Sequence, residues 1–326
     1  MMVCTVSGFL HVLIHHLRKD MDPQALSQKD GLYLDQMLTV IISTKNRWED
    51  LNRALQSLRS QTLPHQVIVM DDNSDDSTFE KTQQLYPEVK ALRFNESKGY
   101  IVRRNEAVQL ATTPYVLSID DDCILESPEI LAQIATFCQQ TKCAAVAWPY
   151  VDVNTNKKVE SISPDGGLWQ ACTFKGCAFV VQRETFLQLG GFRSVLVHQG
   201  EEEDFCIRLL DAGHPVLLGT GTAISHYESP KRSWKRMDYY GSRNLMLFAF
   251  FNVPTSVLPI QLAGSAVKSI LFGFKIKRPY DKTRGVFHGF SDGFKLMRER
   301  KPVSMKTYRK YRELKKSYQK LADINA

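Results

Sequence analysis

The segment Tyr115-Val116-Leu117-Ser118-Ile119-Asp120-Asp121-Asp122 joins a short apolar run directly to three consecutive carboxylates. The apolar part has the length and composition of a buried β-strand. Three adjacent negative charges repel one another and resist desolvation, so the cluster gains nothing from packing. A hard divalent cation is the ligand that such oxygen donors favour. A solvated acidic turn after a strand explains the same pattern without any ligand.

Strands and helices alternate on the N-terminal side of this segment. Apolar, β-branched runs predict strands, and apolar residues at helical spacing predict the helices between them. The strands are predicted over residues 37–42, 66–70, 89–94 and 115–119, and the helices over residues 48–60, 77–86 and 99–110. This βαβα order predicts a doubly wound, Rossmann-like α/β fold with a mostly parallel sheet and helices on both faces.

Three of the predicted strands end in polar clusters, namely Ser43 to Arg47, Asp71 to Ser74 and Asp120 to Asp122. Ligands of doubly wound sheets bind at the carboxyl ends of the strands. We therefore expect the three clusters to line one site. The chain contains neither a G-x-G-x-x-G fingerprint nor a P-loop, which argues against a dinucleotide-binding protein or an ATPase.

The second half of the chain has a mixed pattern. Strands are predicted over residues 144–148 and 178–182, and helices over residues 184–189 and 201–212. We expect a leader over residues 1–36 and one catalytic domain over residues 37–240, with a nucleotide-binding half (37–125) and an acceptor half (126–240). The remainder, residues 241–326, is expected to be an apolar and basic helical region.

That C-terminal region carries two features that bear on partners. Its apolar segments are interrupted by Pro254, Pro259 and Lys268, so no membrane-spanning helix is predicted. A helix lying on a membrane surface, a buried helical layer and a dimer contact stay open. Residues 295–320 hold eleven Lys or Arg and two Glu, which suits anionic lipid head groups or nucleic acid, or is simply a solvated helix face.

The cysteines and the N-terminus indicate the compartment. Seven scattered cysteines without a C-x-x-C pair predict free thiols in a reducing environment. The first apolar stretch is interrupted by His11, His15 and His16, so no secretory signal is expected. The expected location is the cytoplasm, with attachment to the inner face of the plasma membrane as the alternative that the C-terminal region raises.

Five segments in this order resemble the family 2 glycosyltransferases of the GT-A fold. They are residues 40–47, residues 69–74, residues 103–105, residues 119–122, and Gly190-Gly191-Phe192 followed by Gly200-Glu201-Glu202-Glu203-Asp204-Phe205. The resemblance implies a GT-A domain with a C-terminal helical segment. Tyr240-Gly241-Ser242-Arg243-Asn244 is similar to a segment of bacterial rhamnosyltransferase-like members. The processive-synthase signature Q-x-x-R-W is absent, which favours one sugar per event.

The resemblance implies a donor site at the acidic triplet. Asp120 and Asp122 would bind Mn²⁺ or Mg²⁺, Asp121 would face ribose or sugar, and His226 would lie near the metal or diphosphate, although a lone histidine is often structural. Asp72 would accept a hydrogen bond from uracil or thymine, which implies UDP or dTDP; an ordinary turn aspartate is the alternative. The other residues expected to contact the donor are Ser43, Thr44, Asn46, Arg47, Arg104 and Arg243.

The run Glu201-Glu202-Glu203-Asp204 corresponds to the family's acidic pair at a helix N-terminus, which supplies the catalytic base. The resemblance puts the base at Glu202, where the family usually has Asp, with Glu201 and Glu203 as alternatives and Asp204 holding the loop or the acceptor. Such a base deprotonates an acceptor hydroxyl as it attacks the anomeric carbon, which inverts that centre. The helix dipole alone also favours carboxylates there.

Together these features predict a metal-dependent, inverting glycosyltransferase. It would move one sugar from a UDP- or dTDP-sugar to a saccharide or a lipid-linked saccharide, in surface polysaccharide or glycoconjugate synthesis. A nucleotidyltransferase is a weaker alternative, because the loop at residues 43–47 has no glycine. A non-enzymatic, basic-tailed protein that binds membrane or nucleic acid gives the acidic clusters no role, so nucleic acid is not an expected partner.

Overall fold

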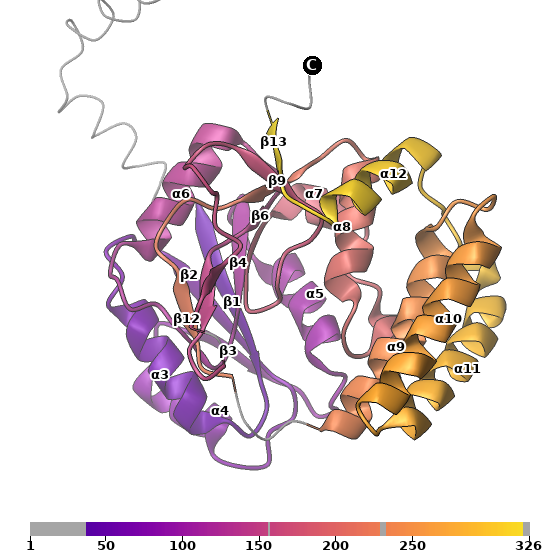
Figure 1. The fold of residues 1–326 in the computed structure, drawn as a ribbon. Coiled ribbons are helices and arrows are strands. Elements are labelled where there is room, and N and C mark those ends of the chain that lie inside the picture. Colours follow the sequence, from indigo (N-terminus) through magenta and orange to yellow (C-terminus); the bar gives the residue numbers. More distant parts are fainter. Residues whose placement is uncertain (1–36, 156, 229–232, 322–326) are drawn as a thin grey trace, which may run out of the picture.

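A nine-stranded sheet forms the centre of the computed structural model, which describes residues 37–155, 157–228 and 233–321 (Figure 1). The predicted leader over residues 1–36 lies outside the described residues. The strands are β1 (Leu38–Thr44), β2 (Gln66–Asp71), β3 (Lys90–Arg93), β4 (Tyr115–Asp120), β6 (Ala145–Ala147), β9 (Trp169–Ala171), β10 (Ala178–Gln182), β11 (Val216–Leu218) and β13 (Gln319–Lys320). Their order is β13-β9-β11-β6-β10-β4-β1-β2-β3. Strands β3, β2, β1 and β4 are parallel, and β10 is antiparallel to β4 and β6.

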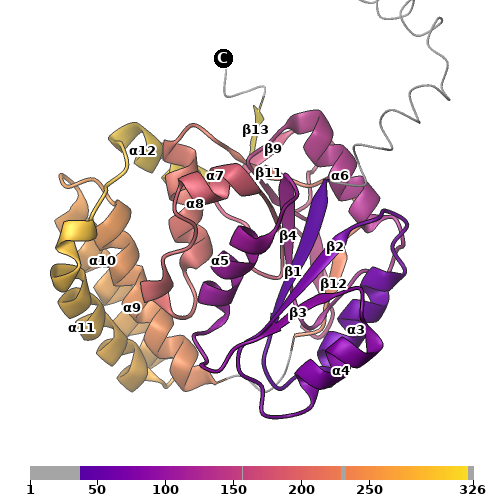
Figure 2. The same cartoon turned by 180° about the vertical axis from the view of Figure 1, so that it is seen from behind.

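Helices cover both faces of this sheet, as predicted (Figure 2). They are α3 (Trp48–Arg59), α4 (Thr78–Leu85), α5 (Tyr100–Leu110), α6 (Ile130–Thr141), α7 (Arg183–Gln188) and α8 (Glu201–Asp211). Successive residues of a strand point to opposite faces. Val40 and Ile42 of β1 therefore share a core with α3 and α6, whereas Ile41 shares a core with α5, α7 and α8. Burial on both faces explains why β1 is apolar without alternation.

A second, four-stranded sheet stands beside the end of β4. Its strands are β5 (Cys123–Ile124), β7 (Tyr150–Asp152), β8 (Val159–Glu160) and β12 (Ile224–His226), in the order β5-β12-β7-β8. The strand β12 lies between two neighbours, and its register sets His226 opposite Cys123 on one side and Asp152 on the other. This small sheet therefore carries a histidine from late in the chain to the acidic triplet.

The C-terminal helices form a layer of their own (Figure 1). They are α9 (Trp234–Asn252), α10 (Leu258–Lys275), α11 (Pro279–Lys295) and α12 (Met305–Leu314). Helix α9 contributes Leu247 and Phe251 to the core beneath the main sheet, and Met246 and Phe250 to a core with α10, α11 and α12. The predicted boundary at residue 240 falls inside α9. None of the helices in the described parts of the chain is both long and apolar enough to cross a membrane.

Three glycines at intervals of four residues form a ridge on α11 that lies against α9. We call Gly285, Gly289 and Gly293 the glycine ridge. A Cβ atom at these positions would lie 2.3 Å from the Tyr239 carbonyl oxygen, 2.6 Å from the Arg243 carbonyl oxygen and 2.1 Å from the Phe250 ring, respectively. The close approach of the two helices therefore depends on the missing side chains.

We expect Gly289→Ala to lower the free energy of unfolding by about 1–3 kcal/mol, because the added methyl group would overpack the α9–α11 contact. Gly264→Ala is a matched control in the middle of α10, where an added Cβ meets nothing within 4 Å. There the better helix propensity of alanine should raise stability by about 0.5–1 kcal/mol. Urea denaturation measures both changes. Equal midpoints for Gly289→Ala and the unmodified protein would contradict the role of the ridge.

Candidate active site

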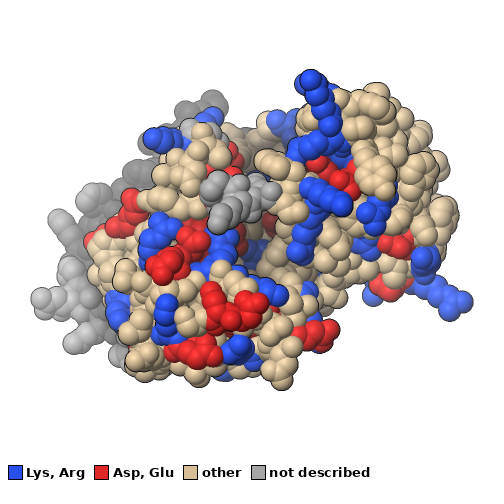
Figure 3. Space-filling view, turned by 90° about the horizontal axis from the view of Figure 1, so that it is seen from below, with Lys and Arg blue, Asp and Glu red and all other residues tan. Residues whose placement is uncertain are grey.

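A cleft of about 1010 Å³ opens at the carboxyl ends of β1, β2 and β4. The strand register brings Ser43 next to Asp120 and Thr44 next to Asp71, so the predicted meeting of three polar strand ends is confirmed. Figure 3 shows the hollow, with Lys, Arg, Asp and Glu side chains around it. Its lining includes Ser43, Thr44, Lys45, Arg47, Asp72, Lys98, Tyr100, Arg104, Asp120, Asp121, Asp122, Asp152, Lys175, Gly176, Glu201, Glu202, His226 and Arg236.

Arg47 and Thr44 contact the two buried carboxylates of the acidic triplet, Asp121 and Asp122. The Arg47 guanidinium lies 3.1 Å from an Asp121 oxygen and 2.7 Å from Asp122 Oδ2. Thr44 Oγ1 donates to Asp121 Oδ2 over 2.8 Å. Burial raises the pKa of Asp121 to about 7, against the effect of Arg47. Asp120 is more open to solvent, with a side chain 38% exposed.

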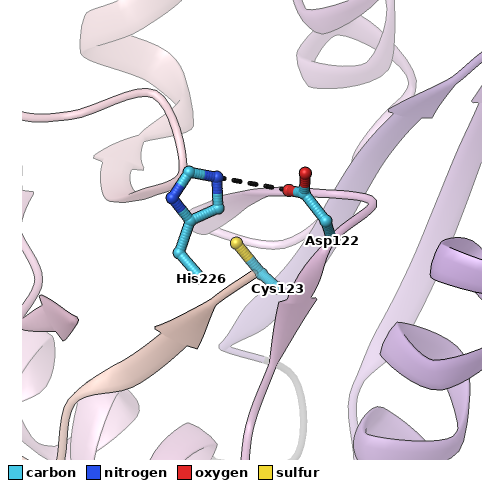
Figure 4. Close-up of side chains that lie close together, drawn as sticks. All are labelled: Asp122, Cys123 and His226. Atoms are coloured by element: carbon cyan, nitrogen blue, oxygen red, sulfur yellow. Dashed lines mark ion pairs between the residues drawn. The ribbon is translucent and has the colours of Figure 1, made fainter. Parts of the chain in front are cut away.

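His226 faces the triplet from β12 (Figure 4). Its Nε2 atom lies 3.2 Å from Asp122 Oδ1 and 3.9 Å from Asp120 Oδ2. Its Nδ1 atom contacts the carboxylate of Asp152, which fixes the orientation of the ring. Burial disfavours the charged ring, but the hydrogen bond to Asp122 and the neighbouring negative charges outweigh it and raise the pKa of His226 to about 10.

The donor atoms at this point fit a hard divalent cation. Ligand atoms of Asp122, Cys123 and His226 lie within 4.8 Å of one another. Asp122 Oδ1 is buried, and it lies 3.2 Å from His226 Nε2, so a carboxylate and an imidazole donor atom face each other at this point. The Cys123 thiol instead donates to the Cys177 carbonyl over 3.3 Å, and burial raises its pKa. The oxygen and imidazole donors of Asp120, Asp122 and His226 are therefore the better match for Mn²⁺ or Mg²⁺.

Arg104 lies between the two acidic clusters of the cleft. One guanidinium nitrogen is 2.5 Å from Asp120 Oδ1 and the other is 3.5 Å from Glu201 Oε1. The first also donates to the Gly176 carbonyl over 2.9 Å. The arginine is buried and stacks over the Tyr100 ring at 4.8 Å. It therefore joins the triplet at the end of β4 to the glutamate run at the start of α8.

The four carboxylates at the start of α8 lie in different environments. Glu201 is fully buried, and desolvation, with the charge of Glu202, raises its pKa to about 8. Glu202 lines the cleft with its side chain partly accessible, and burial raises its pKa as well. A Cβ at Gly176 would lie 3.0 Å from Glu202 Oε1, so that glycine leaves room for the carboxylate.

The other two members of the run face away from the cleft. Glu203 accepts hydrogen bonds from Lys315 Nζ over 2.8 Å and from the Tyr311 hydroxyl over 3.1 Å, both on or beside α12. Asp204 is buried, pairs with Arg193 and Arg208, and accepts from the amide of Asn252 over 2.8 Å. Neither residue belongs to the cleft lining. Their contacts fix α8 against neighbouring elements.

Asp72 lines the cleft but is already saturated by protein donors. Its carboxylate accepts from the Ser97 hydroxyl (2.7 Å), the Lys98 and Gly99 amides (2.9 and 2.8 Å) and Arg103 Nε (2.7 Å). These bonds together lower the pKa of Asp72 in spite of its burial. The residue thus anchors the N-terminus of α5. A direct contact with a nucleotide base stays a prediction, and it requires at least one of these donors to move.

Two other predicted donor residues lie outside the cleft lining. Asn46 connects the loops after β1 and β2. Its backbone N–H donates to Ser74 Oγ over 2.9 Å, and its side-chain oxygen accepts from the backbone N–H of Asp75 over 2.8 Å. Arg243 pairs with Asp292 of α11 over 2.7 Å and donates to the Val195 carbonyl over 2.9 Å. Both side chains therefore support the loops around the cleft and do not line it.

The neighbouring Asn244 holds a strained loop that forms one wall of the cleft. Its side-chain amide donates to the carbonyls of Leu196, His198 and Gln199 over 2.7–2.9 Å. Val197 and Gln199 have φ angles of 61° and 67°, which are rare for residues other than glycine and costly for a β-branched one. The segment at residues 240–244 therefore supports the wall that precedes α8.

Sequence reasoning missed several residues that the fold brings into the cleft, among them Lys98, Tyr100, Asp152, Lys175, Gly176 and Arg236. Asp152 had a usable signal, because a short strand ends in this carboxylate just as β4 ends in Asp120. Lys175 and Gly176 had none, since they lie in an irregular segment before β10. The closeness of Gly176 to Arg104 and Glu202 depends on three segments that are far apart in sequence.

Comparison with known proteins agrees with this architecture. Residues 39–198 match the family model described as Glycosyl transferase family 2. The pre-mycofactocin glycosyltransferase of Mycobacterium tuberculosis is 26% identical over 252 residues, which cover 71% of this chain and 51% of that protein. The chain thus spans about half the length of this curated relative.

Two solved structures resemble the fold. TarS from S. aureus in complex with UDP-GlcNAc has a TM-score of 0.62 at 16% identity, covering 80% of this chain and 81% of that one. The mannosyltransferase PcManGT from Pyrobaculum calidifontis in complex with GDP-Man and Mn²⁺ has a TM-score of 0.53 at 17% identity, covering 79% and 75%. The GT-A fold with C-terminal helices that the sequence predicted is confirmed.

Proposed function

Since the chain belongs to glycosyl transferase family 2, we propose that it transfers a single sugar from a nucleotide-sugar donor, with inversion and with the help of a divalent cation. One observation carries this proposal. The cleft holds an acidic triplet with a histidine on one wall and a partly accessible glutamate on the other, and Arg104 lies between them. A reaction that needs both a diphosphate leaving group and a base uses both walls.

The donor side is the wall at the end of β4. Asp120, Asp122 and His226 would hold Mn²⁺ or Mg²⁺, and PcManGT was solved with Mn²⁺. When bound, the cation would supply Lewis-acid stabilisation of the negative charge that develops on the diphosphate. Lys45 and Lys175 add positive charge to the same cleft.

The acceptor side is the wall at the start of α8, and we assign Glu202 as the base. The acceptor hydroxyl gives its proton to Glu202 while its oxygen attacks the anomeric carbon, and the bond from that carbon to the diphosphate oxygen breaks. Burial favours this assignment, because a carboxylate whose pKa is raised is a stronger base. Glu201 is fully buried, and its carboxylate lies 3.5 Å from the Arg104 guanidinium.

The donor base, the sugar and the acceptor are finer proposals. UDP or dTDP is proposed as the leaving group, and a saccharide or lipid-linked saccharide as the acceptor, in the cytoplasm or at the inner face of the plasma membrane. TarS was solved with UDP-GlcNAc and PcManGT with GDP-Man, so the fold serves donors with different bases. Rhamnosyl transfer stays a prediction.

A thermal-shift screen of UDP, dTDP and GDP, each with and without Mn²⁺, tests the donor class. We expect UDP and dTDP to raise the melting temperature only when Mn²⁺ is present, because Asp120 and Asp122 would hold the cation and the cation would offset the negative charge of the diphosphate. A ligand at about 100 times its Kd adds about 2.7 kcal/mol of stability. Stabilisation by GDP but not by UDP or dTDP would contradict the proposed pyrimidine donor. No shift with any of the three nucleotides would contradict the proposed transfer.

A further inference from the structure

The outer surface of the helical hairpin formed by α10 and α11 is unusually apolar. Nine of the sixteen most exposed large apolar side chains in the described residues lie between Ile260 and Met297, which shows that the exposure is concentrated there. On α10 the exposed fraction is 49–78% for five of these side chains, namely Ile260, Val267, Leu271, Phe272 and Phe274. Single exposed apolar side chains are normal on protein surfaces, whereas a group of them on one hairpin indicates an interaction site.

Helical spacing arranges these side chains as stripes on the solvent-facing side of each helix, and of the α11 stripe the Phe294 ring also packs against Phe250 of α9, with 5.2 Å between the ring centroids. On α10 the stripe is Ile260, Val267, Leu271 and Phe274, opposite the buried Leu262, Ser265, Ser269 and Gly273. On α11 it is Tyr280, Phe287 and Phe294, seven residues apart and 65–72% exposed, opposite the glycine ridge. Each helix of the hairpin is therefore buried on one side against the protein and apolar on the side that faces solvent.

The same hairpin is strongly basic. Between Leu258 and Lys295 there are seven Lys or Arg and two Asp. Lys268, Lys275 and Lys277 are exposed, and the two helices join through the segment at residues 276–278. Aromatic and aliphatic side chains beside exposed lysines are the composition that binds the head-group region of an anionic lipid layer. A second copy of the hairpin would bring like charges together.

The tip of the hairpin lies beside the mouth of the cleft. Arg278 lies over the Trp234 ring at 4.5 Å and pairs with Asp238 over 3.2 Å, and Lys282 pairs with the same aspartate over 3.1 Å. The first turn of α9, which these residues contact, contributes Arg236 to the cleft lining.

We propose that the α10–α11 hairpin docks this protein on an anionic lipid surface, with the exposed apolar stripes in the head-group layer and the lysines on the lipid phosphates. A cleft whose mouth adjoins the docking surface suits an acceptor that is itself anchored in lipid. The docking does not depend on the transfer reaction. Binding to vesicles and release of nucleoside diphosphate are separate measurements, so each can fail without the other.

Vesicle flotation tests this surface. The intact protein should float with vesicles of phosphatidylcholine containing about one third phosphatidylglycerol and stay behind with phosphatidylcholine alone, since only the first carries negative charge. The triple variant Val267→Ser, Leu271→Ser, Phe274→Ser should bind at least tenfold more weakly. The charge variant Lys268→Ser, Lys275→Ser, Lys277→Ser should lose most of the salt-dependent part of the binding.

A control removes three exposed apolar side chains elsewhere, at Leu85, Ile162 and Leu168, which are 39–49% exposed against 57–64% for the three hairpin residues. This triple serine variant should float like the unmodified protein. Failure of the unmodified protein to bind, or equal binding by the hairpin and control variants, would overturn the proposal. So would sedimentation velocity data in which the hairpin variant changes a dimer to a monomer while flotation is unaffected, because the occupant would then be a second copy.

Discussion

Glu202→Gln is expected to lower the turnover of sugar transfer by about 10²–10⁴-fold, the usual contribution of a general base. Glutamine preserves the shape of the side chain in the space beside Gly176 but cannot accept the acceptor proton. Binding of nucleoside diphosphate should be retained, because the donor wall is unchanged. Steady-state release of nucleoside diphosphate, measured beside a nucleotide thermal shift, separates the two effects.

The matched control is Glu203→Gln, one residue further along α8. Glu203 pairs with Lys315 and Tyr311 outside the cleft, so this variant should keep turnover within a few-fold. The pH profile gives a second readout. Burial raises the pKa of Glu202, so the rate of the unmodified enzyme should rise with pH as the carboxylate ionises above its ordinary range, and Glu202→Gln should lose that rise. An unchanged rate in Glu202→Gln, or an equal loss in both variants, would contradict the assignment.

Asp122→Asn is expected to reduce transfer by about 10²–10³-fold and to remove the Mn²⁺-dependent part of nucleotide binding. The amide keeps the volume of the carboxylate but loses the charge that faces His226 and holds Arg47. Electron paramagnetic resonance of Mn²⁺ added with UDP reports the bound cation directly. This readout does not require turnover, so it tests the metal site even if the acceptor is unknown.

Asp75→Asn is the control for this experiment. Asp75 is exposed in the loop after β2 and is not part of the cleft lining, so its loss should leave Mn²⁺ binding and turnover unchanged. Retained Mn²⁺ binding in Asp122→Asn would show that other residues hold the ion. Equal stability of the two variants in urea would establish that the loss in Asp122→Asn is local.

The part of the fold that local pattern controls could be predicted from the sequence. Strands β1, β2 and β4 are buried on both faces, so their residues form continuous apolar runs, and the helices between them show an apolar stripe. Parallel strands place their carboxyl ends at one edge, which is why Ser43 and Asp120 could be expected in one cleft.

What the sequence could not predict depends on contacts between distant segments. Glu203 and Glu202 look alike in the sequence, and only the position of α12 shows that Glu203 points away from the cleft. Arg243 was predicted to bind the diphosphate, but in the structure it pairs with Asp292 of α11. The orientation of His226 likewise needs Asp152, which the small sheet supplies through register rather than through a motif.

Helix α9 serves three parts of the molecule at once. Its first turn contributes to the cleft wall, its middle carries Leu247 and Phe251 into the core under the main sheet, and another side receives the glycine ridge of α11. Few positions on this helix are free to vary for one purpose alone. Divergence of acceptor preference among related enzymes should therefore accumulate in the segments at residues 150–175 and 193–200, while α9 changes slowly and in concert with α11.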